Sequence, residues 1–156
     1  MVELADIITP DNVILNLQSC SSKRQVLSEL ARRGAAVAGI EQQRLLDALT
    51  ERERLGTTGI GHGIAIPHAR LDGLDHLVGM FVRLDRPVDF EALDEQPSDL
   101  IFLLLAPSAA EADSLKALAR ISRMLRDPAL RQRLRQERDP RAVYRMLTQK
   151  PESHAA

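Results

Sequence analysis

Cysteine, aromatic residues and long hydrophobic runs are all scarce in this chain of 156 residues. A lone cysteine, Cys20, excludes an intramolecular disulfide, and the first residues, MVELADIITP, lack the basic and apolar regions of a signal peptide. Aromatic residues make up only 3% of the chain, so we expect a core of Leu, Ile, Val and Ala. The most apolar run, Leu100–Ala106, is far too short to span a bilayer. These features predict a cytoplasmic protein without direct membrane insertion.

The chain also lacks an excess of positive or negative charge, because the formal net charge is only -1. The overall charge therefore provides no electrostatic reason to bind nucleic acid or an anionic membrane. The arginine-rich region Arg120–Arg145 is interrupted by Asp127, Glu137 and Asp139, as is typical of a solvated helix face. We expect no nucleic-acid binding there, although protein partners could use the same charges.

The residues that are present indicate a compact α/β domain. Hydrophobic residues form 44% of the chain and charged residues 28%, and 156 residues suit a single core. Apolar spacing and capping residues predict helices over 21–39, 41–56, 111–127, 128–139 and 140–150, and strands over 13–17, 63–66, 77–84 and 99–106. This alternation predicts a central mixed β-sheet flanked by helices on both faces. We expect one domain over residues 4–148 and a disordered tail over 149–156.

The most unusual stretch runs from Thr57 to Arg70 and reads TTGIGHGIAIPHAR. Glycines such as Gly59 and Gly61 let the backbone approach a ligand closely, and their exposed amides can form an anion site. A proline immediately before His68 stiffens the backbone there. The pattern predicts that His68 lies at a rigid strand exit.

A histidine held in this way can act as a nucleophile towards phosphorus. Neutral imidazole attacks a phosphoryl group to form a phosphohistidine, which can pass the group onward. Threonine hydroxyls, turn amides and the guanidinium of either Arg52 or Arg54 could support the phosphate. The alternative is a non-catalytic binding module in which His68 shares a buried face with Ile64 and Ile66 and has a structural role.

Two segments resemble a known family. The segment RERLGTTGIGHGIAIPHAR is similar to the active-site segment of type IIA proteins of the bacterial phosphoenolpyruvate:sugar phosphotransferase system, in the fructose/mannitol class. The segment LDRPVDFEALDEQPSDLIFLLLAP resembles the family's downstream segment, and the likeness extends over residues 4–147. Within the class, the chain most resembles the nitrogen-related regulatory enzyme IIA. The resemblance implies the type-2 IIA fold.

The resemblance also implies roles for particular residues. His68 would accept a phosphoryl group on Nε2 from a histidine phosphocarrier protein, with Arg52, Thr58 and the Gly59 and Gly61 turn in support. The nitrogen-related branch implies regulatory targets such as sensor kinases or potassium transport components. The alternative within the family is a fructose or mannitol transport component that passes the phosphoryl group to a IIB domain.

One position departs from the family pattern. Many members carry a second histidine near the start of the helix that follows LLAP, and Ser114 occupies that position here. A serine hydroxyl forms hydrogen bonds but does not change charge near neutral pH. His62 is the nearest substitute in sequence, or else a solvent-exposed replacement for a small polar residue.

Other chemistries fit the sequence less well. The spacing of His62, His68 and His76 matches no common zinc pattern, so we expect neither a metal nor a cofactor. The segment GIGHGI follows a predicted helix, whereas a dinucleotide fingerprint follows a strand. Cys20 precedes a predicted helix, where a thiolate could be favoured, although an incidental cysteine is the more common case.

Overall fold

The computed structural model describes residues 3–18 and 20–149. Its helices are η1 (Leu4–Asp6), η2 (Pro10–Asn12), α1 (Lys23–Ala38), α2 (Gln42–Arg54), α3 (Glu111–Leu125), α4 (Pro128–Gln136) and α5 (Pro140–Thr148), where η marks a 3₁₀ helix. Its strands are β1 (Val13–Leu17), β2 (Gly59–Gly61), β3 (Ile64–Ala65), β4 (His68–Leu71), β5 (Val78–Val88) and β6 (Ser98–Pro107). The tail predicted over 149–156 lies outside the described residues apart from Gln149.

The six strands of the described residues form one mixed sheet. Its order is β1-β5-β6-β3-β2, and β4 also pairs with β6. β1 runs parallel to β5, β5 antiparallel to β6, and β3 and β4 both run parallel to β6. The apolar run Leu100–Ala106 forms most of β6 and is buried throughout. The predicted strand over 99–106 is therefore confirmed, and it lies in the interior of the sheet between β5 and β3.

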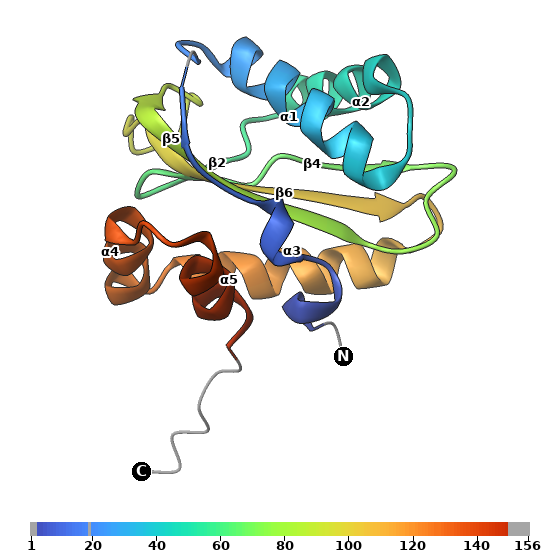
Figure 1. Cartoon of the computed structure of the whole chain (residues 1–156). Helices are drawn as coiled ribbons and strands as arrows, with labels where there is room; N and C mark the ends of the chain where they lie inside the picture. Colours follow the sequence, from blue (N-terminus) through green and yellow to red (C-terminus); the bar gives the residue numbers. More distant parts are fainter. Residues whose placement is uncertain (1–2, 19, 150–156) are drawn as a thin grey trace.

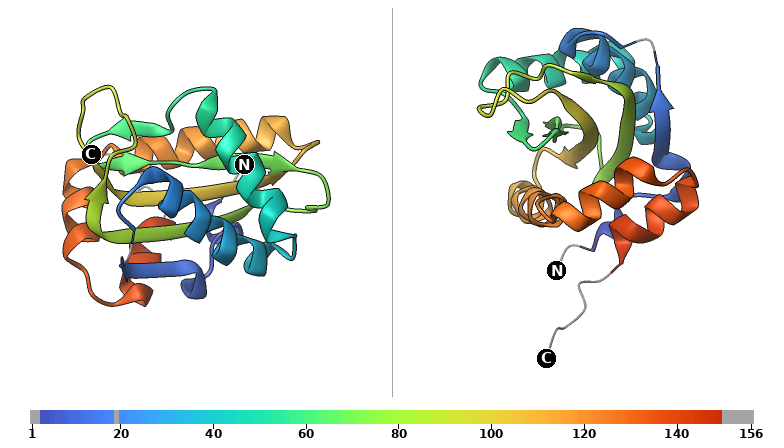
Figure 2. Two further views of the ribbon diagram at one scale, coloured as in Figure 1. Left: turned by 90° about the horizontal axis from the view of Figure 1, so that it is seen from above. Right: turned by 90° about the vertical axis from the view of Figure 1, so that its left-hand side faces the viewer.

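Helices cover both faces of the sheet. In Figure 1, α1 and α2 lie on one face, while α3, α4 and α5 lie on the other, and the right-hand view of Figure 2 shows the same layers from the side. Successive β6 side chains alternate between the two cores, since Ile101 and Leu103 join the α1–α2 side whereas Phe102 and Leu104 join the α3–α5 side. The predicted fold class, a mixed sheet with helices on both faces, is confirmed.

The helix boundaries follow from local capping chemistry. The Ser22 hydroxyl accepts a hydrogen bond from the Gln25 amide at the start of α1, and Gly39 ends that helix with a left-handed φ of 70°. Asp127 and Asp139 cap α4 and α5 in the same way, each followed by proline at the first helical position. All five predicted helices exist, although they end one to three residues earlier than the sequence pattern indicated.

The strand that carries His68 differs from its prediction. We expected one strand over 63–66 with His68 at its exit, but β3 is only two residues long and His68 begins β4. Both short strands pair with β6, and the Leu104 amide donates to the Pro67 carbonyl between them, at 3.0 Å. Proline interrupts the ladder because it lacks an N–H, while its carbonyl keeps the chain beside β6. His68 therefore lies within the sheet, in a short strand that pairs with β6, and not in the loop that follows a strand.

Candidate functional site

His68, the first residue of β4, lies in a depression between α2 and α3. The depression has a volume of about 580 Å³. It is lined by Ala48, Glu51, Arg52 and Leu55 from α2 and its C-terminus, by His68, Ala69 and Arg70 from β4, and by Ser108, Glu111, Ser114, Leu115 and Leu118 from the start of α3. Because β4 and β6 are parallel, the carboxyl end of β4 meets the first turn of α3, which is where α/β proteins commonly place ligands.

Both ring nitrogens of His68 have defined partners. The Nδ1 atom lies 2.7 Å from the Ile66 carbonyl oxygen, and Nε2 lies 3.2 Å from Nε of Arg52. A guanidinium only donates hydrogen bonds, so Nε2 must accept, and a carbonyl only accepts, so Nδ1 must carry the proton. These two contacts select the neutral tautomer with the lone pair on Nε2.

Burial lowers the pKa of His68 below its ordinary value, and the Arg52 charge acts in the same direction. The hydrogen bond to the Ile66 carbonyl and the negative charge of Glu53 oppose this shift without cancelling it. The imidazole is therefore neutral at physiological pH, which is the protonation state of a nucleophile.

Arg52 is fixed in place near the end of α2. Besides its contact with His68, it donates from Nη1 to the Gly56 carbonyl at 2.9 Å. Arg54, the other candidate from the sequence, pairs with Glu51 at 3.4 Å, and its side chain is 75% exposed. Of the two arginines, only Arg52 is among the residues that line the depression.

Thr58 contacts Glu53, a residue that sequence reasoning missed, and neither hydrogen bond of this pair involves His68. Buried Glu53 accepts hydrogen bonds from the Thr58 amide at 2.9 Å and from its hydroxyl at 2.6 Å, and Lys23 lies 3.0 Å from the same carboxylate. Thr58, Gly59 and Gly61 are not among the residues that line the depression. A negative charge in the last turn of a helix interacts unfavourably with the helix dipole. The position of Glu53 near the end of a predicted helix was therefore the sequence signal that its carboxylate has stabilising partners.

Ser114 lies in the same depression as His68. It is buried on the first turn of α3, where its amide donates to the Ala110 carbonyl. Leu55 and Leu115 also line the depression but are 76% and 61% exposed. Ser114, the position at which the family resemblance led us to expect a second histidine, thus lines the same depression as His68, and the depression has an exposed apolar rim.

The other described histidines lie elsewhere. His62 lines a different depression, together with Asp94, Asp99 and Arg135. Its amide donates to Asp94 at 2.8 Å and its carbonyl accepts from Arg135 at 2.8 Å. His76 is exposed and contacts Asp75. Within residues 3–18 and 20–149, no group of three or more His, Cys, Asp or Glu residues could hold a metal ion.

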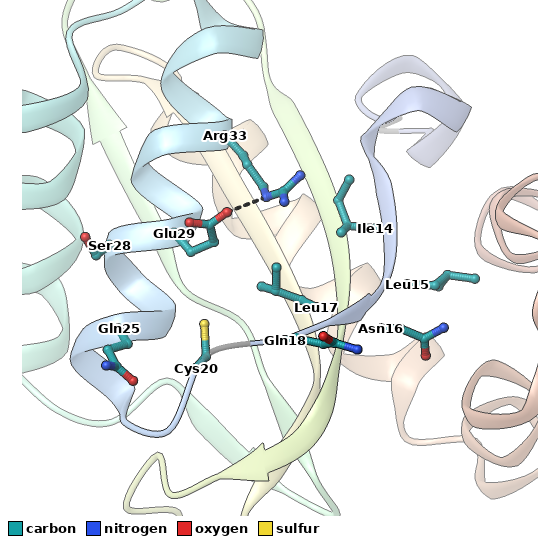
Figure 3. Close-up of a pocket in the computed structure, with 10 residues that line it drawn as sticks. All are labelled: Ile14, Leu15, Asn16, Leu17, Gln18, Cys20, Gln25, Ser28, Glu29 and Arg33. Carbon is teal, nitrogen blue, oxygen red and sulfur yellow. Dashed lines mark hydrogen bonds and ion pairs between the residues drawn. The ribbon is translucent and has the colours of Figure 1, made fainter.

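Cys20 lies beside a separate polar depression between β1 and α1. Figure 3 shows Cys20 near the paired Glu29 and Arg33 of α1, which lie 2.8 Å apart. Burial and the Glu29 charge raise the pKa of the Cys20 thiol, which disfavours a thiolate and agrees with an incidental cysteine, the more common of the two cases considered from the sequence.

Several C-terminal arginines are already engaged within the fold. Arg120 lies 3.4 Å from Glu3, Arg131 donates to the Leu125 carbonyl, and Arg135 makes a two-pronged contact with Asp99. No helix in the described part of the chain is long and apolar enough to cross a membrane.

Comparison with known proteins adds independent information. The family model of the phosphoenolpyruvate-dependent sugar phosphotransferase system, EIIA 2, matches residues 6–150. A nitrogen regulatory protein of Bradyrhizobium diazoefficiens is 47% identical over 97% of this chain and 99% of its own length. The crystal structure of nitrogen regulatory protein IIA-Ntr from Neisseria meningitidis aligns with a TM-score of 0.89 at 30% identity, covering 93% of this chain and 99% of that one.

A more distant structure shows the fold alone. A chain in the Escherichia coli complex of enzyme IIAMTL and phosphorylated enzyme IIBMTL aligns with a TM-score of 0.78 at 17% identity, covering 92% of this chain and all of that one. This chain thus shares its mixed sheet with helices on both faces with these two structures. This chain belongs to the EIIA 2 family of the phosphoenolpyruvate-dependent sugar phosphotransferase system.

Proposed function

We propose that this protein accepts a phosphoryl group on Nε2 of His68 from a histidine phosphocarrier protein and regulates partner proteins through its phosphorylation state. The observation that carries the proposal is the selected tautomer, because Ile66 and Arg52 together leave the lone pair on Nε2. Family membership supports a role in the phosphotransferase system. We infer that the protein acts in the cytoplasm.

The transfer needs no additional acid or base. The Nε2 lone pair attacks phosphorus, the P–N bond of the donor phosphohistidine breaks, and its electron pair returns to the donor ring. The Nδ1–H bond to the Ile66 carbonyl stabilises the positive charge that develops on the imidazole of His68. The hydrogen bond from Arg52 to Nε2 breaks as the lone pair attacks, and the Arg52 guanidinium then pairs with the phosphoryl oxygens.

The regulatory output rests on the relatives. The names of the B. diazoefficiens and N. meningitidis proteins describe nitrogen regulatory proteins. By extension, the phosphorylated and unphosphorylated forms of this chain would bind different targets, such as sensor kinases or potassium transport components. The alternative is transport, in which the group passes on to a IIB domain.

Phosphoryl acceptance by variants of single histidines tests the proposal. The wild type and the variants His68→Ala, His62→Ala and His76→Ala are incubated with phosphoenolpyruvate, enzyme I and the phosphocarrier, and intact mass reports the adduct. We expect only His68→Ala to lose the adduct while circular dichroism shows that it keeps its fold. An adduct that persists on folded His68→Ala would contradict the proposal.

A second measurement separates regulation from transport. Phosphorylated protein is mixed with purified fructose- and mannitol-type IIB domains, and intact mass follows the phosphoryl group. For a regulatory protein, we expect the group to stay on His68. Rapid and complete transfer to a IIB domain would favour the transport alternative.

A further inference from the structure

Arg70 is a second cation beside His68 that the family motif did not single out. Both side chains line the depression, and they are two residues apart in β4. Side chains at positions i and i+2 of a strand project from the same face, about 6.6 Å apart along the chain. A long, flexible arginine side chain can therefore approach the ring of its neighbour.

Arg70 is held more loosely than Arg52. Its Nη1 atom lies 3.8 Å from Oε2 of Glu111 and 3.5 Å from the Ser108 carbonyl oxygen. The Arg70 side chain is 45% exposed and that of Glu111 is 70% exposed, so the pair contributes little to folding stability. Arg52, in contrast, is held by hydrogen bonds to His68 and Gly56. Arg70 can leave its partner at small cost.

The charge balance of the depression favours such a movement. Four charged side chains line it, and the acids Glu51 and Glu111 balance the bases Arg52 and Arg70. A phosphoryl group on Nε2 would itself carry about -1.5 to -2 charges near neutral pH, judged from other phosphorylated side chains. Its three oxygens can accept hydrogen bonds from more than one donor group, and besides Arg52 the other cation in the lining is Arg70.

We propose that Arg70 exchanges its contact with Glu111 for the phosphoryl group on His68. In the unphosphorylated protein, Arg70 partly neutralises Glu111 at the first turn of α3. In the phosphorylated protein, Arg70 binds the phosphoryl oxygens and leaves the Glu111 carboxylate unpaired. The exchange extends the effect of phosphorylation from the depression to the exposed start of α3. This inference rests on His68 being the phosphorylated residue.

Titration of the phosphoryl group tests the exchange without a protein donor. Potassium phosphoramidate phosphorylates histidine directly: the P–N bond of the reagent breaks, ammonia leaves, and a new P–N bond forms at Nε2. The ³¹P resonance that is absent from treated His68→Ala is assigned to His68. Its shift with pH gives the second pKa of the phosphoryl group in wild type, Arg70→Gln, Glu111→Gln and the control Arg54→Gln.

A nearby cation stabilises the dianion, so removing the cation raises this pKa. Arg70→Gln should raise it by roughly half a unit to one unit, after allowance for solvent exposure. Glu111→Gln should lower it, because Arg70 then has no competing partner. Arg54→Gln should match the wild type, because Arg54 lies outside the depression and pairs with Glu51.

Two results would overturn the exchange. One is a phosphoryl pKa in Arg70→Gln equal to that of Arg54→Gln, and the other is a shift of the same sign in Arg70→Gln and Glu111→Gln. If phosphoramidate placed no group on His68 of the wild type, the exchange would also be rejected. Phosphorylation by phosphoramidate but not by the phosphocarrier would count against the proposed donor alone and leave the titration valid.

Discussion

His62 and His68 belong to one glycine-rich stretch, yet the fold fixes different parts of the two residues. For His68, hydrogen bonds hold the ring nitrogens, and the ring is half-buried. For His62, hydrogen bonds to Asp94 and Arg135 hold the backbone, and the residue is exposed with a left-handed φ of 58°. Nucleophilic chemistry needs a fixed ring in one tautomer, so the difference favours His68.

Arg52 contacts His68 and Arg135 contacts the backbone of His62. Replacing each arginine with alanine should give the largest difference in the rate of phosphoryl acceptance. Arg52→Ala should slow phosphoryl acceptance roughly a hundredfold, because it removes a preplaced donor to the transferred group. Arg135→Ala should leave acceptance nearly unchanged but lower the free energy of unfolding by about 1 kcal/mol, since its contacts with Asp99 and His62 are structural.

Acceptance rates with the phosphocarrier and urea unfolding of both variants provide the measurements. If Arg135→Ala slowed acceptance as much as Arg52→Ala while remaining folded, the two segments would be functionally coupled. The proposed contrast between them would then be wrong.

Two glutamates of α2, buried Glu53 and exposed Glu51, test which contacts near His68 stabilise the fold. Glu53→Gln removes the negative charge that accepts hydrogen bonds from the Thr58 amide, the Thr58 hydroxyl and Lys23. Loss of these charge-assisted hydrogen bonds should lower the free energy of unfolding by roughly 1–3 kcal/mol, which urea unfolding measures. The matched control is Glu51→Gln on the same helix, at a side chain that is 61% exposed, with an expected change below about 0.5 kcal/mol. Equal effects in the two variants would exclude a special role for Glu53.

The lowered pKa of His68 predicts how acceptance depends on pH. The nucleophile is the neutral ring, so the acceptance rate should rise with pH through the folded pKa of His68, with a midpoint below the ordinary pKa of about 6.5. The free energy of unfolding depends on pH with the same sign. The contribution of neutral His68 to that free energy is present above the unfolded pKa of the histidine and is lost as pH falls through its folded pKa.

NMR titration of the His68 ring, together with acceptance rates from pH 5 to 8 using phosphoramidate, checks this prediction. Phosphoramidate avoids any pH dependence of a protein donor. A His68 pKa above the ordinary value would contradict the argument from burial.

The smallest effect is expected at Ser114. Ser114→Ala removes a hydroxyl from the depression without changing its charge, so acceptance should stay within about twofold of wild type. Imidazole needs no general base to react, whereas a serine hydroxyl does, so Ser114 should not itself be phosphorylated. Ser114→His provides the complementary test, since a titratable ring there should change the rate or the lifetime of the phosphorylated form.

Loss of all acceptance in a folded Ser114→Ala protein would contradict this prediction. It would mean that the serine takes part in the transfer itself. Intact mass and circular dichroism on the same samples distinguish that result from unfolding.

Local signals predicted the helices well and the short strands poorly. Caps such as Ser22, Asp127 and Asp139 act within one turn of chain, so the sequence contains them completely. The three-residue β2 and the four-residue β4 were missed, because β2 has no apolar alternation and β4 is defined by its pairing with β6. Strand pairing is a long-range contact that single-chain periodicity does not record.

The residues of the candidate site likewise fall into those that the sequence predicted and those that only the structure revealed. His68, Arg52 and Ser114 were named from the sequence, and they line one depression although they come from β4, α2 and α3. Glu53, the Ile66 carbonyl and the Arg70–Glu111 pair were not anticipated, because each acts through a contact that forms only after folding. Thr58 was expected to support a phosphate, whereas in the structure its hydroxyl donates to Glu53.

The sequence by itself determined the family, the fold class and the histidine with a proline before it, because motif order, helix caps and apolar spacing are written in consecutive residues. Only the tertiary structure decided which ring nitrogen of His68 keeps its lone pair, which arginine contacts it and which acid pairs with Arg70. The contacts with Arg52 and Glu111 join β4 to two other elements of the fold, α2 and α3. Side-chain hydrogen bonds form only when packing of the two cores brings such segments within about 3 Å.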